Sequence, residues 1–177
     1  MDEQDKQARF ETVIMPHLDA AYNLARWLTR SEHDAQDVVQ DAFLRAFKFF
    51  DGFRGANSRS WLLSIVRNAS YNWLQKNRKS EVTSVFDEEL HEAEAVVSDP
   101  LAPLLRDAEQ QLVRQAIEEL PVEFREVTIL RELEGMSYKE IAEINEIPIG
   151  TVMSRLARAR KQLQTQLTEK LRQERSL

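Results

Sequence analysis

The side chains best suited to chemistry lie between Ser137 and Lys161, where two short helical patterns flank the turn from Asn145 to Pro148. In the second pattern, steps of 100° per residue place four polar side chains near one stripe: Thr151, Ser154, Arg155 and Arg158. Arginine can donate two hydrogen bonds to guanine, and serine or threonine hydroxyls reach bases or phosphates. A helix that carries such a face in its first turns fits the DNA major groove. The pattern predicts the reading of duplex DNA.

The elements that must position this face carry their own signals. Ser137 and Glu140 have the spacing of a capping box, and Gly135 just before them suits the end of a preceding helix. Pro148 belongs at the start of the second helix, because it lacks a backbone donor. A second stripe is apolar and faces inward: Val152, Leu156, Ala159 and Leu163. A surface helix with solvated arginines is the alternative, but the cap, the turn and the divided faces together favour a helix-turn-helix.

Composition limits the other classes of function. The 177 residues include no cysteine, so thiolate metal sites and disulfides are excluded. His17, His33 and His91 lack the spacing of metal ligands, and no pattern of nucleophile, base and orienting group is present. We therefore expect no cofactor, no metal and no enzyme activity. No apolar run approaches the ~20 residues of a membrane span, and the charged N-terminus is unlike a signal peptide, so we expect a cytoplasmic protein without membrane insertion.

Charge is distributed unevenly along the chain. The formal net charge is −6, yet residues 54–79 carry six bases and no acid, and residues 149–177 carry seven bases and two acids. Two basic blocks allow DNA to be contacted twice. The overall repulsion predicts weak DNA binding by the chain alone.

The first half reads as two helical segments over residues 10–28, with a boundary at Pro16, and as helices over residues 31–50 and 61–75. His17 lies on an apolar stripe as a structural side chain. In the middle helix the pattern buries Ala35, Val38, Val39, Ala42, Ala46 and Phe49. The opposite face carries Asp37, Gln40, Leu44 and Phe47, with Asp41 beside them. Exposed apolar residues among polar ones suggest a partner surface, although Phe47 is equally suited to packing within the domain.

A basic loop, residues 51–60, precedes the third of these helices. That helix buries Leu62, Ile65, Val66, Ala69 and Trp73, and its exposed side is expected to carry Leu63, Ser64, Arg67, Asn68, Tyr71 and Leu74. Cations mixed with aromatic and amide groups suit single-stranded nucleic acid, because bases stack on rings while the backbone meets the cations.

The domain organisation follows from a break in periodicity. Residues 79–103 are acidic and contain two prolines, which predicts a flexible linker. The fold class is therefore all-α, with a domain at 8–78, an acidic linker at 79–103 and a second domain at 104–177. Each domain has about 70 residues and a small core, so the two are expected to move relative to each other.

Two segments resemble a known family. The sequence DAQDVVQDAFLRAFKFFDGFRG, residues 34–55, followed by SWLLSIVRN, resembles region 2 of bacterial RNA polymerase sigma factors. The sequence LPVEFREVTILRELEGMSYKEIAEINEIPIGTVMSRLARAR, residues 120–160, resembles their region 4. The order of the segments and the acidic linker are similar to the extracytoplasmic-function (ECF) subfamily of the sigma-70 family.

The resemblance implies roles for individual residues. Asp37, Gln40, Asp41 and Leu44 are implied to bind the β′ clamp helices of core RNA polymerase, and the second half to meet the β flap. The minus-ten strand is implied to be captured by Arg54, Asn57, Ser58, Arg59, Ser60, Arg67, Asn68 and Tyr71. The minus-thirty-five duplex is implied to be read by Thr151, Ser154, Arg155 and Arg158, with Arg131 and Arg160 on phosphates. Core polymerase, promoter DNA and an anti-sigma factor are the implied partners.

The sequence departs from the family pattern at three places. Met153 stands where Lys or Arg is usual, so one DNA contact is missing. Asn145 and Glu146 replace an apolar-Gly pair, and we expect Asn145 to accept the left-handed geometry of the turn. Residues 70–73, Ser-Tyr-Asn-Trp, leave the identity of the strand-reading residues open.

Two other classes of protein fit parts of the sequence. A stand-alone helix-turn-helix regulator needs its first half to be a dimerisation or sensor domain, and it should bind duplex DNA tightly by itself. A helical adaptor that acts only through protein contacts should give no DNA crosslinks in a polymerase complex.

Overall fold

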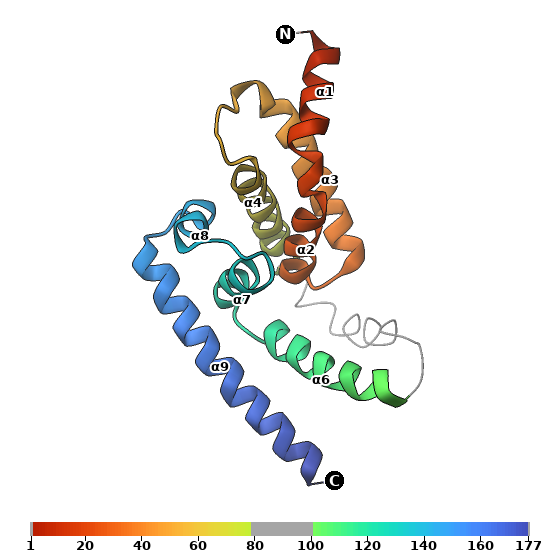
Figure 1. The fold of residues 1–177 in the computed structure, drawn as a ribbon, viewed down its shortest axis with the longest axis vertical. Coiled ribbons are helices and arrows are strands. Elements are labelled where there is room, and N and C mark those ends of the chain that lie inside the picture. The colour runs from red at the N-terminus through yellow and green to blue at the C-terminus, as the bar shows by residue number, and fades with distance from the viewer. Residues whose placement is uncertain (1, 79–100, 177) are drawn as a thin grey trace.

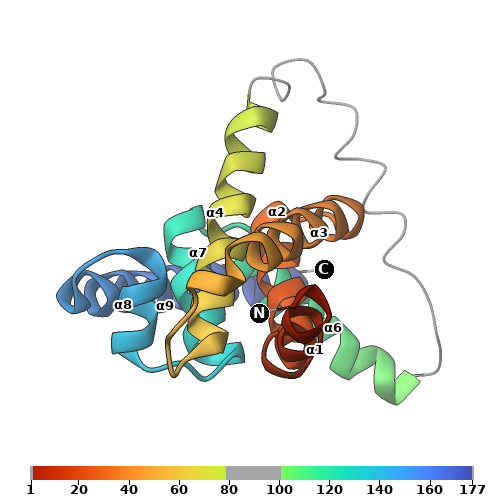
Figure 2. The ribbon, with the colours of Figure 1, turned by 90° about the horizontal axis from the view of Figure 1, so that it is seen from above.

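The computed structural model describes residues 2–78 and 101–176, and every regular element within them is a helix (Figures 1 and 2). The predicted all-α fold is confirmed. Residues 79–100, most of the predicted linker, lie outside the described residues. Among the helices described, none is both long and apolar enough to cross a membrane.

The first half is built on three helices that pack pairwise against one another, α2, α3 and α4. Its elements in chain order are α1 (Glu3–Val13), the 3₁₀ turn η1 (Met15–His17), α2 (Leu18–Thr29), α3 (Glu32–Phe49), the 3₁₀ turn η2 (Phe50–Gly52) and α4 (Ser58–Arg78). The side chain of Ser31 caps α3 by accepting the Asp34 N–H at 3.3 Å, as its spacing predicts. Leu24, Leu28 and Leu62 are fully buried between the three helices.

An aromatic cluster closes one end of this half. The ring of Phe10 meets those of Phe47 and Phe50 edge to face, with centroids 5.3 and 5.4 Å apart. Phe47 therefore packs within the domain, which was one of its two alternatives. The prediction that Phe49 is buried is wrong, since it is 60% exposed. The helix ends there, and the following turn carries Phe50 inward instead.

The second half surrounds the long helix α9. Its elements are α6 (Leu101–Glu118), α7 (Val122–Thr128), the π-helical turn η4 (Ile129–Leu133), α8 (Tyr138–Asn145) and α9 (Ile149–Arg175). In Figure 1, α9 runs past α8 and α7 toward the C-terminus, and α6, α7 and α8 all pack against it. Val152, Leu156 and Ala159 are buried there, as the apolar stripe predicts.

The turn before α9 forms as expected, although by a different residue. Ser137 and Glu140 make the reciprocal capping box, Gly135 has a φ of +64°, and Pro148 is the N-cap of α9. The left-handed position is Glu146, with a φ of 54°, and not Asn145. Asn145 remains in the last turn of α8 with its side chain buried, because its neighbours Ile141 and Ile144 face the same core.

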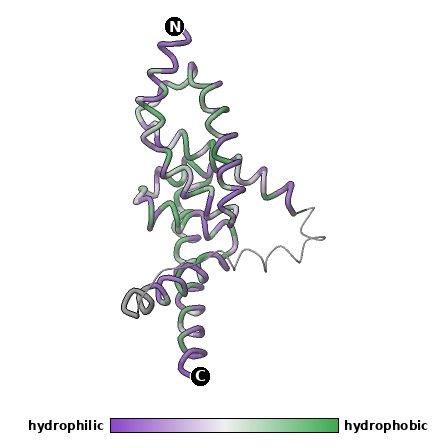
Figure 3. Tube along the Cα trace, turned by 90° about the vertical axis from the view of Figure 1, so that its right-hand side faces the viewer, coloured by the Kyte–Doolittle hydropathy of each residue, from purple (hydrophilic) through white to green (hydrophobic). Residues whose placement is uncertain are grey.

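The two halves are in contact. Helix α4 packs against α8, and α2 packs against α7 and η4 (Figure 2). In Figure 3 hydrophobic segments are spread through the body of the molecule, while the first turn of the chain and the end of α9 are hydrophilic. Leu63 was expected to be exposed and is fully buried. Periodicity within α4 could not show this, because the second half covers that side of the helix.

Candidate nucleic-acid interface

The N-terminal face of α9 keeps most of its predicted groups open. Ser154 and Arg158 are exposed and Thr151 is half-buried. Arg155 is different: its side chain is only 26% exposed, and its Nη1 lies 3.9 Å from Oε1 of Glu126. Three of the four predicted duplex-reading groups therefore point away from the core, while the fourth faces a buried carboxylate.

Arg131 and Arg160 have protein partners. Arg131 donates from Nη1 to the carbonyl of Met136 at 2.8 Å and lies over the ring of Tyr138. Arg160 donates from Nη2 to Oε1 of Glu132 at 3.1 Å, and this hydrogen bond raises the pKa of Arg160. Arg131 thus holds the turn before α8, while Arg160 stays 58% exposed on an ion pair at the surface. Their predicted contact with phosphates remains a prediction.

The loop of the first half is shorter than the sequence suggested. Helix α4 begins at Ser58 and ends at Arg78, three residues beyond the predicted helix at each end. Asn57 explains the early start, because its Oδ1 accepts the Ser60 N–H at 3.1 Å and so caps the helix. The hydroxyl of Ser58 lies 3.0 Å from Nε2 of His17. Ser58, Arg59 and Ser60 therefore stand on the first turn of a helix.

Several predicted strand-reading groups contact the second half. Nδ2 of Asn57 donates to Oε2 of Glu140 at 2.9 Å, and the hydroxyl of Ser60 lies 3.4 Å from the same oxygen. These hydrogen bonds, together with one from the backbone of Ser137, lower the pKa of Glu140. Nη2 of Arg59 donates to Oε2 of Glu134 at 2.8 Å, and Asn23 donates to the other oxygen of that carboxylate.

The deepest of these contacts joins Arg67 to Glu126. The guanidinium donates from Nε to Oε2 at 2.9 Å and from Nη2 to Oε1 at 3.3 Å, and the Glu126 side chain is fully buried. Burial raises the pKa of the Glu126 carboxyl, and the hydrogen bonds and charge of Arg67 oppose that rise. Arg67 also lies over the Tyr71 ring, 4.3 Å from its centroid. Burial and the nearby Glu126 raise the pKa of the Tyr71 hydroxyl.

Arg54 and Asn68 remain exposed. The eight predicted strand-reading residues therefore lie together on the loop before α4 and along its first turns, but part of the set faces protein. Sequence reasoning missed the carboxylates that meet them: Glu126, Glu134 and Glu140. Glu126 carried a signal, since it stands four residues before the buried Leu130 on the same side of its helix.

The outer face of α3 is open, as predicted. Asp37, Gln40 and Asp41 are exposed and Leu44 is 70% exposed. Asp41 pairs with Arg45 one turn along the same helix, 3.1 Å away. An exposed leucine on the same helix face as carboxylates and an amide has the composition of a protein-binding surface.

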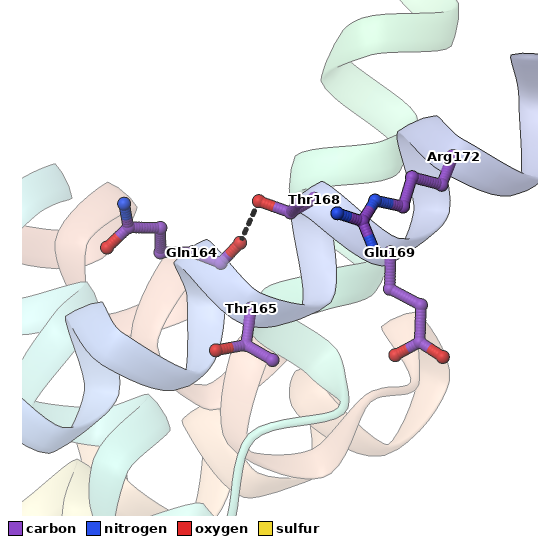
Figure 4. A pocket seen from close by; sticks show the side chains of 5 residues that line it. All are labelled: Gln164, Thr165, Thr168, Glu169 and Arg172. Carbon is purple, nitrogen blue, oxygen red and sulfur yellow. Dashed lines mark hydrogen bonds between the residues drawn. The ribbon is translucent and has the colours of Figure 1, made fainter.

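A shallow hollow on α9 lies apart from these residues (Figure 4). Its lining comes from that helix alone: Gln164, Thr165, Thr168, Glu169 and Arg172. Thr168 donates its hydroxyl to the carbonyl of Gln164 at 2.7 Å, so this polar group already has a partner within the helix. The hollow is the surface of one helix and does not extend the interface.

A capped helix-turn-helix packed beside a helical domain with its own basic helix defines a two-part, α-helical DNA-binding protein. Family models agree with both parts: Sigma-70 region 2 matches residues 13–80, and Sigma-70, region 4 matches residues 110–163. The chain belongs to the ECF subfamily of the sigma-70 family of RNA polymerase sigma factors. A region 2 match in the first half decides against both the stand-alone regulator and the adaptor.

Curated relatives cover most of the chain. The RNA polymerase sigma-H factor of Pseudomonas aeruginosa is 34% identical over a match of 177 residues, with coverage of 96% of this chain and 91% of the relative. The ECF RNA polymerase sigma-E factor of Escherichia coli K12 is 36% identical over 146 residues, with coverage of 78% and 76%.

Solved structures share the fold. The sigma factor RpoE from Bartonella quintana, in complex with the anti-sigma factor NepR, has a TM-score of 0.71 at 31% identity, with coverage of 90% of this chain and 97% of that chain. CnrH in complex with the cytosolic domain of CnrY has a TM-score of 0.64 at 26% identity, with coverage of 92% and 90%.

Proposed function

We propose that this sigma factor directs initiation by reading its promoter in two physical states, the minus-thirty-five element as duplex and the minus-ten element as separated strand. The observation that carries the duplex part is the outward face of Thr151, Ser154 and Arg158 behind a capped turn. A helix held by that turn can enter the major groove with its first turns toward the bases.

The strand part is supported by the grouping of donors and rings around α4. Arg54 lies on the loop, and Arg59, Arg67 and Tyr71 lie along α4 from its first turn to its middle. Cations placed in this way can follow a backbone while a ring stacks on a base. Trapping an unstacked base offsets the loss of pairing, so melting needs no covalent step. We infer that the chain acts without catalysis or a cofactor.

Partners are inferred from the remaining surfaces. The exposed face of Asp37, Gln40, Asp41 and Leu44 on α3 suits the β′ clamp helices, and the second half suits the β flap. We also infer the division into a domain at 8–78, a linker at 79–103 and a domain at 104–177. Because the similar RpoE structure holds an anti-sigma factor, we infer such a partner here.

Run-off transcription tests the proposal. Purified bacterial core polymerase is supplied with a genomic promoter library, with and without this protein. We expect new start sites that require both components and share two sequence elements. Unchanged initiation, with no binding to core polymerase in a pull-down, would overturn the proposal.

A further inference from the structure

One stripe of α4 is covered by the second half of the chain. Arg59, Leu63, Arg67 and Tyr71 recur every four residues, so they share one side of the helix. Leu63 is fully buried, the Arg67 side chain is 18% exposed and that of Arg59 is 33% exposed. A strand captured along this stripe would have to replace the protein groups now lying on it.

Those protein groups are anions. Glu140 accepts from Asn57, Glu134 accepts from Arg59, and Glu126 accepts from Arg67 through both of its oxygens. A carboxylate and a phosphodiester offer the same kind of charged acceptor to an arginine fork. The three carboxylates come from the segment η4 to α8 and the end of α7, while their donors come from the cap and first turns of α4. The contact therefore sets one row of acceptors against one row of donors.

Glu126 also reaches the duplex-reading helix. Its Oε1 lies 3.9 Å from Nη1 of Arg155, while both of its oxygens accept from Arg67. A single buried carboxylate thus faces one arginine from each proposed DNA-binding surface. Burying the two ions of such a pair costs desolvation free energy, which offsets much of their attraction. The contact can therefore hold the halves together and still be exchanged for a contact with another anion.

A separate contact is made by the residue next to Glu126 and involves no predicted DNA-binding residue. The buried guanidinium of Arg125 donates to the carbonyls of Glu118 and Leu120 at the end of α6, at 2.9 and 3.2 Å, and to that of Leu28 in α2, at 3.4 Å. Burial, followed by the charge of Arg30, lowers the pKa of Arg125 to about 10. Carbonyls at helix C-termini carry partial negative charge and favour a cation. Helix α7 therefore contacts both α2 and α4 of the first half, and both contacts favour a closed arrangement.

We propose that the second half of the free chain competes with the minus-ten strand for α4, with Glu126, Glu134 and Glu140 in the places that strand phosphates take. The inference rests on the strand-capture function proposed above. Closure and strand binding are then mutually exclusive, and each weakens the other by the same factor. In the free chain these carboxylates keep the strand off α4 until DNA or polymerase separates the halves.

The test replaces the three carboxylates in the full chain by Glu126→Gln, Glu134→Gln and Glu140→Gln. Glutamine keeps the shape of each side chain and still serves in a capping box, so the Ser137 cap survives. A charge-matched control changes three exposed acids of the same half: Glu143→Gln, Glu146→Gln and Glu169→Gln. Small-angle scattering measures the radius of gyration, and anisotropy of a fluorescein-labelled oligo-dT measures single-strand affinity.

We expect the triple variant to expand and to bind the oligonucleotide about tenfold more tightly. A gain of about tenfold is expected if about nine-tenths of the wild-type molecules are closed and the variant is open. The control variant should keep the wild-type radius and gain less than about twofold. Saturating oligonucleotide should also expand the wild-type protein. If Glu126→Gln prevents folding, the double variant with Glu134→Gln and Glu140→Gln, whose carboxylates lie nearer the surface, gives the same readouts.

Two results would overturn the inference: a triple variant with wild-type radius and affinity, or one that expands without binding more tightly. A polymerase holoenzyme carrying Arg67→Ala distinguishes failure of this inference from failure of the proposed strand capture. Loss of promoter melting by that holoenzyme, beside an unchanged triple variant, would leave strand capture standing and remove only the competition. Normal melting by the Arg67→Ala holoenzyme would count against strand capture by α4 itself.

Discussion

The Arg67 guanidinium donates two hydrogen bonds to the buried carboxylate of Glu126, at 2.9 and 3.3 Å, across the contact between the two halves of the chain. The donor belongs to the proposed strand-reading set and the acceptor to the domain proposed to read duplex. This pair therefore joins the stability of the fold to the proposed closure and the proposed DNA binding.

Arg67→Ala is expected to lower the free energy of unfolding by about 3 kcal/mol, because it leaves the Glu126 carboxylate buried without its two hydrogen bonds from a cation. The pKa of Glu126 is already raised by burial. An acid with a raised pKa is relieved by protonation, so the loss should be largest at high pH and shrink as pH falls through that pKa. Urea unfolding across pH measures both. The double change Arg67→Met with Glu126→Leu should recover most of the stability, and no recovery would contradict the buried-charge explanation.

Arg158→Ala is expected to weaken binding of the holoenzyme to its promoter duplex by about 1–3 kcal/mol, because Arg158 is an exposed guanidinium on the outward face of α9. Arg172→Ala, on the same helix but near its far end, is the matched control and should change binding little. Filter binding with promoter and scrambled duplexes measures the effect. An equal loss on both duplexes would assign Arg158 to phosphates and not to bases.

Local sequence signals predicted the helices well. The caps of α3 and α8, the proline at the start of α9 and the apolar stripes all act within a few residues, so their physics is visible in a short window of sequence. The prediction for Phe49 was wrong because Phe49 is the last residue of α3, and the turn that follows brings Phe50 into the core instead. Glu146 took the left-handed position because α8 keeps Asn145 in its last turn.

The contacts between the halves could not be predicted in the same way. Arg67 and Glu126 are 59 residues apart, and Asn57 and Glu140 are 83 apart, so no periodicity joins them. The sequence showed that α4 carries a basic and aromatic side, but whether those side chains meet solvent or carboxylates depends on which segment covers that side. The predicted site residues were thus found as types and positions, while the carboxylates that meet them required the fold.

His17 is expected to make stability depend on pH. Burial, followed by the charge of Arg59, lowers its pKa below 6.5. The folded chain then binds fewer protons than the unfolded chain, so this stability is present above 6.5 and is lost as pH falls through the lowered pKa. Urea unfolding at about pH 7.5 and about pH 5.5 should show a smaller difference for His17→Gln than for wild type. An identical difference in both proteins would contradict the assignment.

Glu146→Gly is expected to stabilise the chain by about 1 kcal/mol, because Glu146 has a φ of 54°, where a Cβ is strained and glycine is not. Glu143→Gly provides the opposite control: this exposed residue lies inside α8, where glycine costs about 1 kcal/mol. Thermal unfolding of the two variants should move the midpoint in opposite directions. A lower midpoint for Glu146→Gly would mean that its side chain contributes more than its backbone strain.

Asp37→Ala combined with Gln40→Ala is expected to weaken binding to core polymerase while the melting temperature stays near that of wild type, because both side chains are exposed on the outer face of α3. Residues at an interface with polymerase contribute to affinity, whereas exposed residues away from special contacts change stability by less than about 0.5 kcal/mol. Gln4→Ala, exposed on α1 and so away from this face, is the control and should leave affinity nearly unchanged. Pull-down titrations with core polymerase and thermal unfolding measure the two quantities. A large fall in melting temperature would make this face structural, and unchanged affinity would place the polymerase contact elsewhere on the chain.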